Sequence, residues 1–219
     1  MKFRIVQRPS APTRDLSIRP SVIGVRSRPL RVLDFDVEAR PLHWIASDYV
    51  SKEITAMAWA WTDKPDDVTC YLLGETDPIL MLREFVKAYN QADLVTGHFI
   101  RGYDLPMING ALMEYRLPVL GDKATQDTKG DLVRRAGLSM SQESLGSMLR
   151  LDQKKVTMNQ AKWRSANRLE PEGRELARER VTGDVKMHIE MRRELLALNY
   201  LAPVKTWRSG SARVEQYTP

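Results

Sequence analysis

The chain has 219 residues, of which 42% are hydrophobic and 28% are charged, values typical of a soluble protein with one core domain. No stretch approaches the roughly 18 uninterrupted apolar residues of a membrane-spanning helix, and the N-terminus lacks an apolar secretion signal, so we expect a cytoplasmic protein without membrane contact. The single cysteine, Cys70, excludes an internal disulfide and a cysteine-based metal cluster.

The positive charge of the chain is concentrated at its N-terminus. Seven of the first 30 residues are basic and one is acidic, an excess equal to the formal charge of +6 of the whole chain. We divide the chain into a basic, proline-rich extension (1–29), a globular domain (30–200) and a C-terminal tail (201–219). The extension is either a flexible arm that contacts phosphates or a poorly ordered terminus with an edge strand at 22–25.

From residue 30 onward the hydrophobic pattern predicts strands and helices in alternation. Strands are expected where residues alternate or are continuously apolar, at 30–37, 54–61, 69–73 and 93–98. Helices are expected where apolar residues recur at helical spacing, at 78–89, 105–115, 129–136, 141–150 and 172–198. Segment 152–171 is interpreted as a long polar, basic loop. Antiparallel strands followed by strand–helix alternation predict an α/β fold, with a mixed sheet flanked by helices.

Asp36 and Glu38 end the first predicted strand. Because side chains alternate along a strand, both carboxylates lie on one face, with Cα atoms about 6–7 Å apart. They repel each other unless a cation lies between them, and Mg²⁺ and Mn²⁺ prefer oxygen ligands. Taken alone, the pair is more often two solvated acids than a metal site. Asp34 lies on the same face and is an alternative partner for Asp36.

Two further acids occupy positions that attract attention. Asp104 follows a glycine-containing loop and comes directly before a predicted helix, where it is either an N-cap or a metal-directed acid. Gly183 and Asp184 interrupt good helix formers in the long C-terminal helix. A glycine there costs about 1 kcal/mol relative to alanine, and it usually marks a close approach of another group.

The order of these motifs resembles that of the DEDD 3′→5′ exonuclease superfamily, the proofreading, DnaQ-like group with a ribonuclease H-like fold, phage-type members included. The resemblance covers about residues 30–198. It is carried by D-x-E at 36–38, by G-H-x-I-x-x-Y-D-L-P at 97–106 and by G-D-V at 183–185, with D-T at 127–128 and S-L-G-S-M-L at 144–149. The resemblance implies four metal-binding, catalytic acids, with Asp127 in a structural role: Asp36, Glu38, Asp104 and Asp184.

The resemblance also implies an activity. It suggests a two-metal 3′→5′ exonuclease that uses Mg²⁺ or Mn²⁺. The substrate would be single-stranded DNA, or RNA, whose phosphodiester bonds the enzyme hydrolyses. The protein would act alone or with a polymerase or another replication partner. The main alternative is an exonuclease-fold module that binds nucleic acid with little or no catalysis. A ribonuclease H-type endonuclease or resolvase shares the fold, but the motif at 97–106 argues against it.

The chain departs from the family pattern at two motifs. Phe99 occupies the place of an asparagine, and Arg180 and Glu179 occupy the places of the tyrosine or histidine that precedes the last aspartate. The residue that would orient or deprotonate the attacking water is therefore not where the family has it. Arg180 instead suits a substrate phosphate, which its planar guanidinium can bind.

Three further residues are candidates for contact with nucleic acid. Lys162 and Trp163 lie in the basic segment, where an aromatic side chain among cations suits stacking on a single strand. His98 is either a nucleic-acid contact or a histidine satisfied within the protein. His188, one helical turn after Asp184, is interpreted as a helix-surface residue.

Overall fold

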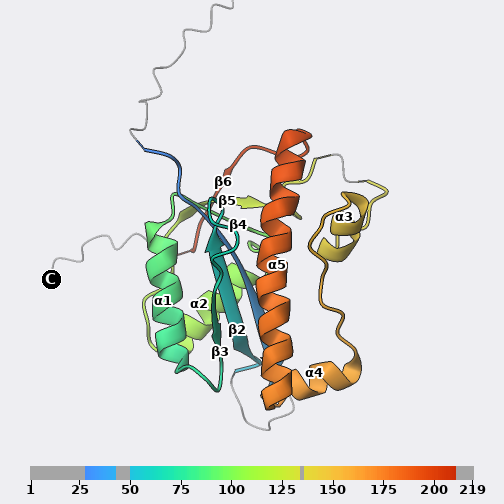
Figure 1. The fold of residues 1–219 in the computed structure, drawn as a ribbon. Helices are drawn as coiled ribbons and strands as arrows, with labels where there is room; N and C mark the ends of the chain where they lie inside the picture. Colours follow the sequence, from blue (N-terminus) through green and yellow to red (C-terminus); the bar gives the residue numbers. More distant parts are fainter. Residues whose placement is uncertain (1–27, 43–49, 134–135, 211–219) are drawn as a thin grey trace, which may run out of the picture.

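The computed structural model describes residues 28–42, 50–133 and 136–210 (Figure 1). Most of the basic extension, including 22–25, lies outside the described residues. The strands are β1 (Val32–Pro41), β2 (Lys52–Trp61), β3 (Thr69–Leu72), β4 (Leu94–Gly97), β5 (Lys123–Asp127) and β6 (Lys205–Trp207). The helices are α1 (Pro78–Gln91), α2 (Asp104–Glu114), α3 (Gln142–Met148), α4 (Gln160–Asn167) and α5 (Pro171–Ala197).

Within the described residues the strands form one six-stranded sheet in the order β3–β2–β1–β4–β5–β6. β1 is central: it pairs antiparallel with β2 and parallel with β4. β3 and β6 add antiparallel strands at the two edges, and β5 pairs parallel with β4. The predicted α/β class, a mixed sheet flanked by helices, is confirmed.

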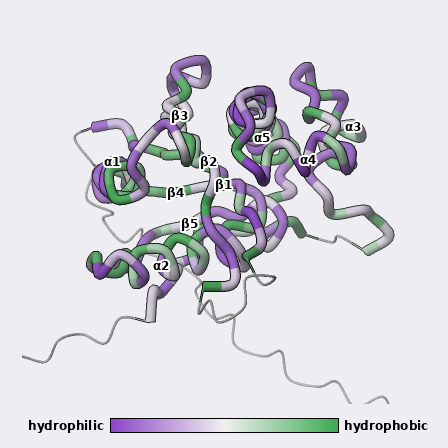
Figure 2. The backbone as a smooth tube through the Cα atoms, turned by 90° about the horizontal axis from the view of Figure 1, so that it is seen from below, coloured by the Kyte–Doolittle hydropathy of each residue, from purple (hydrophilic) through white to green (hydrophobic). Residues whose placement is uncertain are grey.

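Helices cover both faces of the sheet. α1 and α2 lie on one side, and α5 lies on the other together with α3 and α4 (Figures 1 and 2). Because side chains alternate along β1, Leu33, Phe35 and Val37 enter the main core with α1 and α2. The intervening positions of β1, which are acidic, therefore face α5.

Alanines on β2 allow α5 to approach these acids. In the antiparallel pairing of β1 with β2, each acid lies directly opposite an alanine; the pairs are Asp34 with Ala60, Asp36 with Ala58, and Glu38 with Ala56. Directly opposed residues share a face of the sheet. The three alanines pack against Ala177, Val181, Val185 and Ile189 of α5. The small side chains bring the helix close enough for its polar residues to reach β1.

The structure corrects three of the sequence-based expectations. The described part of the predicted helix at 129–136 is a turn, because Asp127 Oδ1 accepts hydrogen bonds from the backbone N–H groups of Lys129 and Gly130. The segment 152–171 is not one continuous loop: it contains α4, whose N-cap Asn159 accepts from Lys162 N. The close approach expected at Gly183 occurs instead at Gly173, where a Cβ would collide with the backbone of Ser165 in α4.

Two strands were missed. β5 reads K-A-T-Q-D, a short and mostly polar sequence, although its last three residues are buried. β6 is a three-residue edge strand inside the segment expected as a tail, so the sheet extends beyond residue 200. Neither strand has the apolar alternation by which strands are recognised from sequence.

Candidate metal centre

Three side chains of α5 face the three acids of β1 in antiparallel order. The helix residues are Arg180, Asp184 and His188, and their partners are Glu38, Asp36 and Asp34, respectively. Four helical residues rise about 6 Å and two strand residues rise about 6.6 Å, so the two repeats match. We call the pairs the outer rung (Arg180–Glu38), the middle rung (Asp184–Asp36) and the inner rung (His188–Asp34).

The outer rung is an ion pair, and the inner rung is a hydrogen-bonded pair. The Arg180 guanidinium donates from Nε to Glu38 Oε1, and His188 Nδ1 lies within hydrogen-bond distance of Asp34 Oδ2. The expectation of a helix-surface histidine is wrong, because His188 is 2% exposed. The small side chains of β2 that let α5 approach are the reason: His188 points into the layer between helix and sheet.

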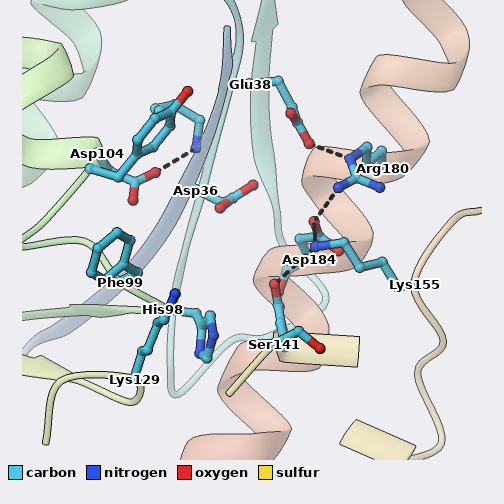
Figure 3. A pocket seen from close by; sticks show the side chains of 13 residues that line it. Asp36, Glu38, His98, Phe99, Asp104, Lys129, Ser141, Lys155, Arg180 and Asp184 are labelled. Atoms are coloured by element: carbon cyan, nitrogen blue, oxygen red, sulfur yellow. Dashed lines mark hydrogen bonds and ion pairs between the residues drawn. The ribbon is translucent and has the colours of Figure 1, made fainter. Parts of the chain in front are cut away.

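The middle rung brings two acids together. Asp36, Glu38 and Asp184 each offer a carboxylate oxygen, and these atoms lie within 4.8 Å of one another (Figure 3). Asp184 Oδ1 is buried and has no hydrogen-bond partner among the residues that the structure describes. A buried carboxylate oxygen without a donor is costly unless a cation satisfies it. The donor set and the orphaned oxygen both fit a hard divalent cation.

Asp104 lies beside this cluster. It is the first residue of α2, whose N-cap is Tyr103, so Asp104 is not the N-cap. Its buried Oδ1 accepts a hydrogen bond of 3.2 Å from the backbone N–H of Val37, the residue between the two acids of β1. Burial raises the pKa of Asp104 to about 7, against the opposing effect of that hydrogen bond.

The electrostatics of the cluster oppose full ionisation. Burial raises the pKa of Asp36 well above its ordinary value, and the negative charges of Asp104, Asp184 and Glu38 raise it further. Burial also raises the pKa of Glu38, although Arg180 acts in the opposite direction. Carboxylates whose ionisation is disfavoured in this way become stable anions when a cation binds among them.

Two cations of the chain already reach the cluster. Lys155, from the segment between α3 and α4, places Nζ 2.7 Å from Asp184 Oδ2 and 3.3 Å from Gln142 Oε1. Arg180 Nη2 lies 3.9 Å from the same Asp184 oxygen. Lys155 was not a candidate from sequence, because its position in a basic segment gives no sign that its ammonium group reaches Asp184.

The acids lie in a cleft of about 260 Å³. His98, Phe99 and Lys129 line one part of it, and Ser141, Lys155 and Arg180 line another (Figure 3). Phe99 is 42% exposed and has a left-handed backbone with φ of 73°. The backbone N–H of Phe99 is held by Asp127 Oδ1 at 3.0 Å, and Lys129 Nζ lies 4.1 Å from the centre of its ring.

The remaining candidate contacts lie around the cleft. Both ring nitrogens of His98 are engaged within the protein, Nδ1 with Thr128 Oγ1 at 3.0 Å and Nε2 with the carbonyl of Met140 at 2.9 Å. Trp163 in α4 is partly buried, and the Arg180 guanidinium lies 5.0 Å from the centre of its ring. Lys162 donates to the carbonyl of Thr157, away from the acids.

Comparisons with known proteins agree with the fold. No family model matches the chain, and no curated protein matches it. Among solved structures it is similar to the family B DNA polymerase from the hyperthermophilic archaeon Pyrobaculum calidifontis, with a TM-score of 0.57 and 19% sequence identity over 77% of this chain and 25% of that chain. The chain therefore spans about a quarter of the polymerase's length, and the likeness concerns the fold alone.

Fold and site together define a class. The chain is an α/β protein whose mixed sheet is consistent with a ribonuclease H-like fold, and it carries a carboxylate cluster that could hold a metal ion. Of its described helices, none has the length and apolar character needed to cross a membrane.

Proposed function

We propose that the protein is a metal-dependent 3′→5′ exonuclease acting on single-stranded DNA, with RNA as the other substrate class that fits. The middle rung carries the proposal: two facing carboxylates, with Glu38 and Asp104 beside them, form a site of excess negative charge inside a cleft. The motif order that resembles DEDD exonucleases supports it, because residues far apart in sequence converge here. The likeness to a DNA polymerase supports a role in nucleic-acid chemistry, with a polymerase or replication partner.

Asp36, Glu38 and Asp184 would hold one Mg²⁺ or Mn²⁺ ion, and Asp36 with Asp104 would hold a second. Bound divalent ions lower the pKa of a coordinated water and neutralise charge on a phosphodiester. The chain's own contribution is to position the strand. Arg180 and Lys155 line the cleft and would bind phosphate oxygens there, and Trp163, beside them, would offer an aromatic ring to the strand.

None of the three residues at or near the family's water-activating position is suited to remove a proton from the attacking water. Arg180 stays protonated, Glu179 is exposed on another face of α5, and His188 is committed to Asp34. General acid–base assistance is typically worth ~10²–10⁴-fold, so we expect a slow enzyme.

The test uses a 5′-labelled single-stranded oligonucleotide with Mg²⁺ or Mn²⁺. We expect a ladder that shortens stepwise from the 3′ end, abolished by excess chelator and by Asp36→Asn. Asp66→Asn is the matched control, because Asp66 is a surface acid paired with Lys186 outside the cleft, and it should leave the ladder unchanged. Undiminished hydrolysis in chelator would refute the mechanism, and internal cuts would indicate an endonuclease.

The alternative, a binding module without catalysis, is favoured by one observation. Lys155 and Arg180 already neutralise part of the cluster with charges that belong to the chain. In that case no shortening appears with either metal, while the oligonucleotide still binds and Arg180→Ala weakens that binding.

A further inference from the structure

A chain of hydrogen-bonded side chains runs beneath the cleft from β1 to its wall. It starts at the inner rung, where Asp34 meets His188 Nδ1. His188 Nε2 lies 2.9 Å from Thr128 Oγ1, and the same hydroxyl lies 3.0 Å from His98 Nδ1. His98 Nε2 ends the chain at the carbonyl of Met140, 2.9 Å away. Asp34, Thr128 and His188 are each at most 2% exposed.

The direction of each hydrogen bond follows from the carbonyl of Met140 at the end of this chain of side chains. A carbonyl oxygen only accepts, so His98 Nε2 carries the proton. Burial, together with the nearby His188, lowers the pKa of His98 to about 4, so the ring is neutral at pH 7 and Nδ1 accepts. The single proton of Thr128 then goes to His98, and its oxygen accepts from His188 Nε2. The other nitrogen of His188, Nδ1, faces Asp34 Oδ2. The carbonyl of Gly97, at 3.4 Å, is the more distant competitor for the Thr128 proton.

Members of this chain adjoin residues of the cleft. Asp34 precedes Asp36 by one same-face position of β1, and His188 follows Asp184 by one turn of α5. At the other end, Met140 precedes Ser141 and Gln142, which line the cleft, and Gln142 Nε2 donates back to the carbonyl of Asp184 at 2.8 Å. The hydrogen bonds thus link the sheet, α5 and the start of α3 around the carboxylates.

We propose that Asp34, His188, Thr128 and His98 form a positioning relay that fixes the wall at the start of α3 against the carboxylates, and so sets the geometry in which Asp36 and Asp184 hold a divalent cation. None of the four is among the carboxylates proposed to hold the cation, so the relay acts on the cation site through the start of α3, and His98 also lines the cleft. The effect of the relay on a bound cation rests on the proposed function, whereas the hydrogen-bond pattern of the relay does not.

The experiment removes the hydrogen bonds at the centre of the relay and leaves the size of the Thr128 side chain nearly unchanged. Thr128→Val removes the hydroxyl from both histidines, and Thr128→Ser restores it. Thr96→Val is the matched control: Thr96, in β4, is as buried as Thr128 and donates to the carbonyl of Gln126 at 2.8 Å rather than to a member of the relay. Partners bonded directly to a metal ligand are typically worth 10–100-fold in metal affinity, and Thr128 acts through two histidines one step further away. We therefore expect Thr128→Val to lower the Mn²⁺ affinity, measured by calorimetry, by about 10-fold at most. Thr128→Ser and Thr96→Val should stay close to the wild type.

A second readout needs neither metal nor turnover. Long-range ¹H–¹⁵N NMR of the metal-free protein should show neutral His98 protonated on Nε2, and Thr128→Val should disturb the signals of both histidines. Protonation of His98 on Nδ1, or equal Mn²⁺ affinities for Thr128→Val and Thr96→Val, would overturn the relay. A wild type that does not bind Mn²⁺ would instead refute the proposed function, together with the relay's role in holding a cation, while NMR still decides whether the hydrogen-bond pattern exists.

Discussion

Two clusters of buried and partly buried acids lie at β1 and at the end of β5, on either side of β4, and they differ in how their oxygens are satisfied. At the end of β5, Asp127 accepts backbone hydrogen bonds from Phe99, Arg101, Lys129 and Gly130. Asp131 accepts from both terminal nitrogens of Arg101, at 2.8 and 2.6 Å, and pairs with Lys205 at 2.8 Å. In the middle rung, by contrast, Asp184 keeps one buried oxygen without a partner among the described residues.

The pKa values of the two clusters diverge accordingly. Burial raises the pKa of Asp36 and neighbouring acids raise it further. Burial alone would also raise the pKa of Asp131, but hydrogen bonds from Arg101 and Lys205 outweigh it and lower the pKa. The comparison teaches that burial does not identify a functional acid. The carboxylate oxygens of Asp127 and Asp131 accept hydrogen bonds from the protein itself, whereas Asp184 in the middle rung has an oxygen that can bind a ligand.

The largest expected effect on the free energy of unfolding comes from an aspartate-to-asparagine exchange, made once in each cluster. Asp131→Asn leaves Arg101 and Lys205 without their carboxylate. We expect a loss of about 2–3 kcal/mol in the free energy of unfolding, less than for a fully buried ion pair because both cations are partly exposed to solvent. Asp36→Asn removes a repelled charge and should leave the stability of the metal-free protein at pH 7 equal or higher. Urea unfolding of both variants in chelator measures this, and equal losses would erase the distinction between the clusters.

The pH dependence of stability sharpens the same comparison through Asp104. Its pKa is raised to about 7 in the folded state from an ordinary 3.8, so the folded state binds the extra proton between these values. The stabilisation from this proton is fully present below pH 3.8 and is lost as the pH rises through 7. We expect the unfolding free energy of the metal-free wild type, relative to Asp104→Asn, to fall by up to about 1.4 kcal/mol per pH unit in this window.

The measurement is urea unfolding of both proteins from pH 4 to pH 8 in chelator. Subtracting the variant removes the contribution of the carboxylates that do not interact with Asp104, so the difference reports Asp104 together with its effect on Asp36. A difference that is constant across this range would contradict the raised pKa.

Much of this site was accessible from the sequence, but the pairing of Asp34 with His188 and the reach of Lys155 to Asp184 were not. The acid spacing on β1 and the motif order predicted which acids converge, because strand alternation and local motifs are encoded within a few residues. Asp34 was visible on the same face of β1, yet its partner His188 was assigned to the helix surface. That error arose because the depth of α5 depends on the alanines of β2, which its own pattern does not reveal. Lys155 reaches Asp184 through a loop, which no periodicity describes.

The next effect concerns Lys155, whose ammonium group lies 2.7 Å from Asp184 in the middle rung. If its ammonium competes with a divalent ion for Asp184, Lys155→Ala should raise the Mn²⁺ affinity by about tenfold, equivalent to about 1.4 kcal/mol. Lys154→Ala is the matched control, because Lys154 donates to the carbonyl of Leu151 rather than to the acids. Calorimetric titration compares the two. An unchanged or lower affinity for Lys155→Ala would mean that Lys155 supports the ion instead of competing with it.

The smallest expected effect is at Phe99, which Asp127 holds in the left-handed region. Asparagine adopts this conformation more readily than phenylalanine, so Phe99→Asn should raise the unfolding free energy by up to about 1 kcal/mol, less what is lost with the ring's contacts. Arg116 is the control, because it has φ of 54° after α2 and lies outside the cleft. Arg116→Asn should give a similar gain in urea unfolding and leave oligonucleotide binding unchanged. If Phe99→Asn gains stability but loses oligonucleotide binding, the phenylalanine ring contributes to binding in spite of its strained backbone. If oligonucleotide binding is also unchanged, Phe99 has no part in recognition.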